Sequence, residues 1–168
     1  MSKDIGATGA RLGCVVTRNR EVRDSIALVA HTSVSNISIL FARVLLTSPR
    51  FHTIVQLNSS RLALAYEQIR IFFEENSIEY LQCEATTFIL ARLAPCSRTR
   101  DDEMAAVAYY QKAGILFFSA AGYHMPPDFR GWMRVSFAVG PERLSVAIKR
   151  LKTAYQAYMS RESSRDAL

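Results

Sequence analysis

Two cationic side chains and three glycines make the start of the chain a candidate for chemistry. The stretch from Ser2 to Gly13 reads SKDIGATGARLG, with Lys3 near its beginning and Arg11 near its end. Glycines at this density let the backbone adopt positive φ and pass close to a ligand or to another chain. A lysine amine with a depressed pKa can form a Schiff base, and a guanidinium offers a phosphate a fixed positive fork. On spacing alone, a flexible loop with incidental charges is the alternative interpretation.

A third cation lies within an apolar stretch near the end of the chain. The stretch from Gly131 to Ala138 reads GWMRVSFA, and Arg134 stands inside it. This composition predicts a strand. An arginine in such a strand is costly to bury unless it has an anionic partner, which favours a carboxylate ligand. An edge-strand arginine that faces solvent is the alternative, and we expect Trp132 to belong to the core.

The spacing of apolar residues predicts a helix-rich first half. Residues 12–17 are apolar and β-branched, and they predict a buried strand. Asn19 is a suitable N-cap for a helix that extends to about residue 30. Two more helices are expected, over 36–46 and from residue 48 to about residue 73. A helix as long as the last spans about 35 Å, a length that often connects two domains.

The second half alternates short strands with two helices. We predict strands over 78–82, 86–93, 115–118 and 132–138, and helices over 101–112 and from residue 141 onward. Lys112 followed by Gly114 is typical of a helix end, and Pro141 is typical of a first helical turn. This order predicts an α+β sandwich in which helices cover a small sheet. A polar, frayed tail is expected from Ser160.

Composition and charge exclude several classes of protein. The 168 residues are 49% apolar and 21% charged, which is ordinary globular usage and excludes disorder. No apolar run reaches the roughly 20 residues of a membrane span, and the polar start is not a signal peptide. The net charge of +6 comes from arginines spread from Arg11 to Arg165, which excludes a basic nucleic-acid-binding patch. We expect a cytoplasmic protein with neither nucleic acid nor membrane as a partner. The cysteines and histidines lack metal-ligand spacing, so no metal site is predicted.

Both motifs resemble those of the fold-type-I pyridoxal-phosphate enzymes of the class I/II aminotransferase group. The likeness is greatest to the aminocyclopropane-carboxylate-synthase-like branch, and it covers about residues 2–160. The first stretch resembles the family pattern S-K-D-x-G-x-x-G-x-R-x-G. The resemblance implies that Lys3 forms the internal Schiff base with pyridoxal 5'-phosphate. It also implies that Ser2 and Arg11 contribute to the cofactor site, where Arg11 binds the phosphate, and that Arg134 grips the substrate's α-carboxylate.

The same resemblance implies an α/β architecture of the fold-type-I aminotransferase kind, matched only in its C-terminal part. Residues 1–47 correspond to a remnant of the large cofactor-binding domain, and 48–76 to the long connecting helix. Residues 77–160 correspond to the small α+β C-terminal domain, followed by a polar tail over 161–168. The family's aspartate for the pyridine nitrogen, and the residues that hold the ring, precede the lysine. They are therefore absent from this sequence, which is truncated just before the Schiff-base lysine.

The resemblance implies transamination between an α-amino acid and a 2-oxo acid, in amino-acid or secondary metabolism. Because most of the cofactor shell is missing, we expect impaired activity of the chain alone. It would then act as a homodimer or with a chain that supplies the large domain. Two alternatives remain open at this point. One is a non-catalytic aminotransferase remnant that acts by protein association, and the other is a pyridoxal-phosphate lyase of the aminocyclopropane-carboxylate-synthase type.

Overall fold

The computed structural model describes residues 1–2, 5–30 and 34–165. The chain forms two compact units, Met1–Arg61 and Leu62–Leu168, and the boundary between them lies inside a long helix, α3, Phe51–Glu75. None of the described helices is both long enough and apolar enough to cross a membrane.

The first unit is helical and has almost no core. It contains a short 3-10 helix, η1 (Thr8–Ala10), two α-helices, α1 (Arg20–Ala30) and α2 (Asn36–Leu46), and the first part of α3. The expected caps and bounds of α1 are confirmed, because the amide of Val22 donates to Asn19 Oδ1 at 3.2 Å. Among the described residues of this unit, Ala42 alone is buried.

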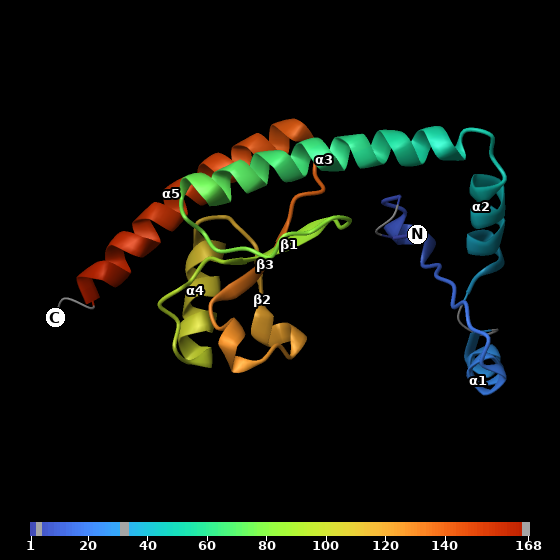
Figure 1. Ribbon diagram of the computed structural model, residues 1–168, viewed down its shortest axis with the longest axis horizontal. Coiled ribbons are helices and arrows are strands. Elements are labelled where there is room, and N and C mark those ends of the chain that lie inside the picture. The colour runs from blue at the N-terminus through green and yellow to red at the C-terminus, as the bar shows by residue number, and fades with distance from the viewer. Residues whose placement is uncertain (3–4, 31–33, 166–168) are drawn as a thin grey trace. The chain divides into compact units, whose positions relative to one another are not determined.

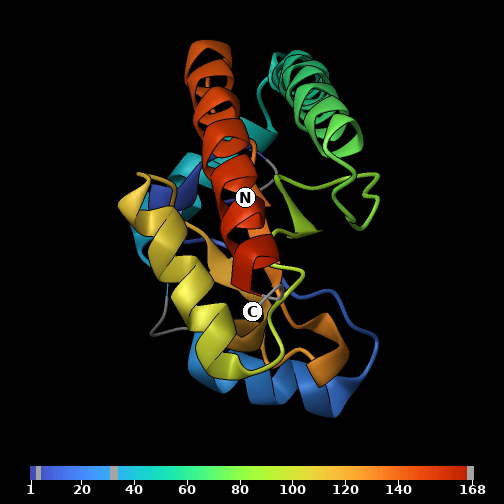
Figure 2. The same cartoon turned by 90° about the vertical axis from the view of Figure 1, so that its left-hand side faces the viewer.

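The second unit contains a three-stranded antiparallel sheet with the order β1-β3-β2. Its strands are β1 (Phe88–Arg92), β2 (Phe118–Ser119) and β3 (Trp132–Ser136), and its other helices are α4 (Arg100–Lys112) and α5 (Pro141–Arg165). Two 3-10 turns, η2 (Ala120–Tyr123) and η3 (Pro127–Phe129), connect β2 to β3. The later part of α3 and helix α5 lie side by side (Figures 1 and 2).

The sheet has one buried face and one open face, because side chains alternate along a strand. Ile89, Ala91, Met133 and Val135 are buried and belong to one core cluster. The helices contribute to the same cluster, for example with Phe73 from α3, Tyr110 from α4 and Leu151 from α5. The α+β arrangement expected for this half is therefore confirmed.

Tyr110 shows how a polar group is accommodated in this core. Its ring is fully buried, and its hydroxyl donates to the carbonyl oxygen of Leu93 at 2.8 Å. Burial raises the pKa of the Tyr110 hydroxyl well above its usual range, so the group stays neutral and keeps its proton for this bond. The bond fixes α4 against the end of β1.

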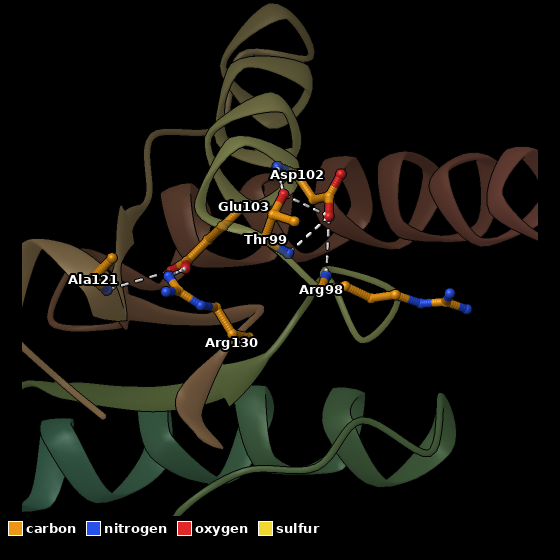
Figure 3. Close-up of polar contacts among 6 residues, drawn as sticks. All are labelled: Arg98, Thr99, Asp102, Glu103, Ala121 and Arg130. Atoms are coloured by element: carbon orange, nitrogen blue, oxygen red, sulfur yellow. Dashed lines mark hydrogen bonds and ion pairs between the residues drawn. The ribbon is translucent and has the colours of Figure 1, made fainter. Parts of the chain in front are cut away.

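Helix α4 begins with a reciprocal cap (Figure 3). The amide of Asp102 donates to Thr99 Oγ1 at 3.1 Å, and the amide of Thr99 donates to Asp102 Oδ2 at 2.8 Å. The amide of Arg98 also donates to Asp102 Oδ2, at 3.1 Å. This capping box uses Thr99 and Asp102, which leaves the neighbouring Glu103 for another contact.

Four expectations about local structure were wrong. Residues 12–17 form no strand, since none of the described residues pairs with them and a strand needs a hydrogen-bonded neighbour. Residues 78–82 make only an isolated bridge, between Tyr80 and Ala91. The strand expected over 115–118 is instead β2, at Phe118–Ser119. The last helix continues through Ser160 to Arg165, where a frayed tail was expected.

The core position of α5 gives a first prediction. Leu151 is 3% exposed in the core cluster, whereas Val146 on the same helix is 56% exposed. Leu151→Ala should lower the free energy of unfolding by about 2–5 kcal/mol, because a buried cavity remains. The matched Val146→Ala should change it by less than about 0.5 kcal/mol. Urea titration of both variants measures the difference, and equal midpoints would show that α5 is not part of the core.

Gly131, directly before β3, gives a second prediction. Its φ is +77°, and a Cβ there would lie 1.9 Å from the carbonyl oxygen of Ala94. Gly131→Ala should therefore cost about 3 kcal/mol or more in the free energy of unfolding. Gly140→Ala, after the same strand, is the control, since a Cβ there meets no atom within 4 Å. Thermal unfolding separates the two, and a Gly131→Ala variant as stable as the wild type would contradict the close approach to Ala94.

Candidate functional site

The glycine-rich loop folds back on itself through local hydrogen bonds. The amide of Ile5 donates to the carbonyl of Met1 at 3.3 Å, and Thr8 Oγ1 donates to the carbonyl of Ser2 at 3.5 Å. Gly6 takes a φ of +70°, as expected for a turn that glycine favours. Lys3, the residue expected to carry the covalent chemistry, lies outside the described residues, as does Asp4.

Arg11 ends this loop in a left-handed conformation, with a φ of 46°. Its backbone amide and its Nη1 both donate to the carbonyl of Thr8, each at 3.4 Å. The side chain is exposed, so the rest of its guanidinium is accessible to an anion. The loop therefore carries one accessible cation and the hydroxyl group of Ser2, donors that suit a phosphate, while the Thr8 hydroxyl already donates within the loop.

The same loop offers little to an aromatic cofactor ring. The described residues among 1–18 include no carboxylate and no aromatic side chain. A pyridine nitrogen would have no acidic partner in this stretch, and a ring would have no stacking surface. The described loop thus fits the phosphate end of pyridoxal phosphate, while its ring requires residues from elsewhere.

The other predicted site residue, Arg134, lies on the open face of the sheet in the second unit. In the register of β3, Arg134 pairs with Leu90 of β1 on one side and with Phe118 of β2 on the other. Its neighbours Met133 and Val135 both enter the core, so Arg134 must lie on the opposite face. Because β3 is the central strand and is paired on both sides, the alternative that Arg134 lies on an edge strand is wrong.

Three aromatic rings surround the Arg134 guanidinium. Its Cζ lies 5.1 Å from the ring centroid of Phe88, 5.0 Å from that of Phe118 and 4.9 Å from that of Tyr123. Ring faces attract a guanidinium by about 0.5–2 kcal/mol per contact and leave its N–H groups unused. Within the described part of the chain, no carboxylate or carbonyl hydrogen-bonds to this guanidinium. Arg134 is thus a half-buried cation whose donors remain for a ligand.

Segment 120–131 covers part of the open face and is attached to the rest of the unit by a buried carboxylate (Figure 3). Glu103 of α4 is 1% exposed. Its Oε2 lies 3.3 Å from Nη1 of Arg130, and its Oε1 accepts from the amide of Ala121 at 3.4 Å. Both ends of the segment therefore contact a single side chain of α4.

Sequence reasoning missed most of this environment. It did not identify Phe88, Phe118 or Tyr123 as neighbours of Arg134, and it did not identify Glu103. The alternation of β1 was the available signal, since Phe88 has the same parity as the residue that pairs with Arg134. No local signal identifies Glu103 as buried, because the acidic first turn of α4 also contains Asp101 and Asp102, which are both exposed.

A pocket of about 210 Å³ lies elsewhere in the second unit and is mostly apolar. Ile69, Phe117, Leu144 and Leu151 are among its lining residues. Val135 also lines it, so it lies on the core face of β3, away from Arg134. None of the predicted site residues borders this pocket, and the described residues contain no group of three metal-ligating side chains.

Known proteins are similar to this chain, and the name of one of them describes it as a probable aminotransferase. The chain is 38% identical to "Probable aminotransferase aclI" of Aspergillus oryzae, over 90% of this chain and 36% of that protein. It is 37% identical to "Trimodular acetylaranotin synthesis protein ataIMG" of Aspergillus terreus, over 74% of this chain and 14% of that protein. The chain spans about a third of the length of the first of these relatives.

A solved structure supports the fold. The aspartate aminotransferase of Thermus thermophilus, in a mutant form complexed with tryptophan, superposes with a TM-score of 0.62 at 20% sequence identity. The match covers 92% of this chain and 39% of that structure. The expected fold-type-I aminotransferase architecture is thus confirmed, as a partial α/β domain.

The family described as "Aminotransferase class I and II" matches residues 1–151, which is most of the sequence. The match includes both the glycine-rich loop with Arg11 and the strand with Arg134. The chain belongs to the class I and II aminotransferase family.

Proposed function

We propose that this chain is the part of a pyridoxal-phosphate-dependent aminotransferase that carries the cofactor lysine and the substrate-carboxylate arginine. The observation that carries the proposal is the state of Arg134. Its guanidinium is half-buried among three rings, and no anion among the described residues occupies its donors. A carboxylate binds such a fork through two parallel charge-assisted hydrogen bonds. The substrates are an α-amino acid and a 2-oxo acid.

Each site residue has a defined part in the proposed reaction. Electron withdrawal by the bound cofactor would make the proton on the substrate's Cα acidic. Lys3 would hold the cofactor covalently through Nζ, and the same amine would move the Cα proton. Arg11 and Ser2 bind the cofactor phosphate. Arg134 would hold the substrate's carboxylate and so fix the orientation of its Cα.

The chain requires further protein surface to complete this site. In the first unit, Val16 is 93% exposed, Ile37 81% and Leu28 75%. So much uncovered apolar surface is typical of an interface. We infer that a second copy of this chain, or a chain that supplies the large cofactor-binding domain, covers this surface, and that the large domain holds the cofactor ring.

The setting of the reaction follows from the relatives. The name of one relative assigns it to the synthesis of acetylaranotin. We propose that this chain also acts in secondary metabolism. We propose the cytoplasm as the place where it acts. The non-catalytic alternative keeps the same interface and differs in one respect, namely that Lys3 remains unmodified.

The incomplete cofactor shell gives a third prediction. The purified chain with pyridoxal phosphate and a panel of amino donors should turn over well below about 1 per second. A chimera in which residues 1–151 replace the matching region of "Probable aminotransferase aclI" supplies the missing domain. Borohydride reduction and peptide mass spectrometry should find the cofactor on Lys3 of the chimera, and Lys3→Ala should abolish both the label and the turnover. An active chimera without label on Lys3 would refute the assignment.

The proposed binding of the substrate's carboxylate by Arg134 gives a fourth prediction. In the same chimera, Arg134→Ala should reduce kcat/KM for the amino donor by about 10²-fold, because the carboxylate loses a charged partner. The loss should appear mainly in KM, since the carboxylate is bound in the ground state as well. Arg143→Ala is the control, because this arginine is exposed on α5. Equal kinetics of the two variants would assign the carboxylate to another residue.

A further inference from the structure

We propose that Glu103 is a positioning residue for Arg134, acting through the segment 120–131 that it holds at both ends. The proposal rests on the proposed role of Arg134 and adds to it a residue that touches neither substrate nor cofactor. Glu103 controls where Tyr123 lies, and Tyr123 is one of the three rings that frame the guanidinium.

The burial of Glu103 needs an explanation, because an ionised carboxylate is unfavourable in a protein interior unless it is paired and hydrogen-bonded. The cap of α4 does not require it, since Thr99 and Asp102 form the capping box. Its partners are Nη1 of Arg130 and the amide of Ala121. Both partners lie on segment 120–131, so the buried carboxylate acts on that segment.

Segment 120–131 has few other attachments. Its backbone hydrogen bonds are mostly local, such as those from His124 to Ala121 and from Arg130 to Pro127. At its end, the carbonyl of Gly131 accepts from the amide of Ala94 at 3.0 Å. The first turn, η2, has no comparable backbone bond to a distant element among the described residues, and the Glu103–Ala121 bond takes that place.

Tyr123 is in the same turn as Ala121. Tyr123 lies two residues after Ala121 in η2, so we infer that the Ala121–Glu103 bond helps to place the Tyr123 ring. The start of the turn is also held by buried Ala120 and by Ser119, which pairs with Met133. The Tyr123 ring itself is 41% exposed and lies 4.9 Å from Cζ of Arg134. Loss of the Glu103 charge should release η2 and allow Tyr123 to leave the guanidinium. Arg134 would then have two framing rings, both of them from the sheet.

The 168-residue chain is sufficient for the test, which uses NMR of the Arg134 side chain. The Nε–Hε proton of an arginine surrounded by ring faces resonates upfield of a free arginine. Glu103→Gln should shift this resonance toward the free value, and exchange of the Ala121 amide should become about tenfold faster. Asp101→Asn is the matched control, an exposed carboxylate of the same turn of α4.

A second variant keeps the test valid if Glu103→Gln disturbs the fold. Tyr123→Leu keeps the Glu103–Arg130 pair intact, and it should shift the Arg134 resonance in the same direction without accelerating the Ala121 amide. An Arg134 resonance and an Ala121 exchange rate that are unchanged in Glu103→Gln would overturn the proposal.

Titration with pyruvate, a small 2-oxo acid, separates the positioning role of Glu103 from the carboxylate-binding role of Arg134. In the wild type, pyruvate should move the Arg134 resonance, and Glu103→Gln should weaken the apparent affinity about tenfold, to the same extent as Tyr123→Leu. If the resonance depends on Glu103 but does not respond to pyruvate, the positioning role stands and the carboxylate role of Arg134 fails. If pyruvate binds equally to the wild type and to Glu103→Gln, the positioning role fails while the carboxylate role stands.

Discussion

The pairing of β3 between β1 and β2 is the constraint on which the candidate site depends. A strand with neighbours on both sides must alternate its side chains between two faces. Met133 and Val135 occupy the core, so Arg134 has to lie on the open face between Phe88 and Phe118. A register shift by one residue would bury the guanidinium and expose two apolar side chains. The same packing that stabilises the second unit therefore places the Arg134 guanidinium on the open face.

The open face would be a plain solvated surface without the segment between β2 and β3. Gly131 lets this segment pass within contact distance of the Ala94 carbonyl, where any side chain would collide. Glu103 attaches the start of the segment through the amide of Ala121. Near its end, Phe129 packs on Trp132 with ring centroids 5.5 Å apart. A buried ion pair contributes little net stability when compared with an apolar pair, but it specifies one geometry. Here the segment adds the Tyr123 ring to the Phe88 and Phe118 rings that the sheet already places around Arg134.

The two units differ in how much of their stability comes from a core of their own. The second unit has a continuous core that includes residues from the sheet and from α3, α4 and α5. The first unit buries only Ala42 among its described residues, and helices of this length gain most of their stability from packing. Caps and apolar stripes without a core are typical of a segment that packs against further protein surface. This agrees with the length of the first relative, of which the matched region covers 36%.

The sequence by itself determined the features that depend on near neighbours. Asn19 and Pro141 located helix starts correctly because capping and fixed φ act within one turn. The strand around Arg134 was predicted from the apolar composition of its own residues. The strand expected over 12–17 was wrong because a strand is stabilised by backbone partners that are distant in sequence. The surroundings of Arg134 could not be predicted either, since Phe88, Phe118 and Tyr123 meet only after the sheet has formed. Only the tertiary structure decided which of three adjacent acids in α4 is buried, because burial depends on what packs against a helix face and the local sequence is almost the same for all three.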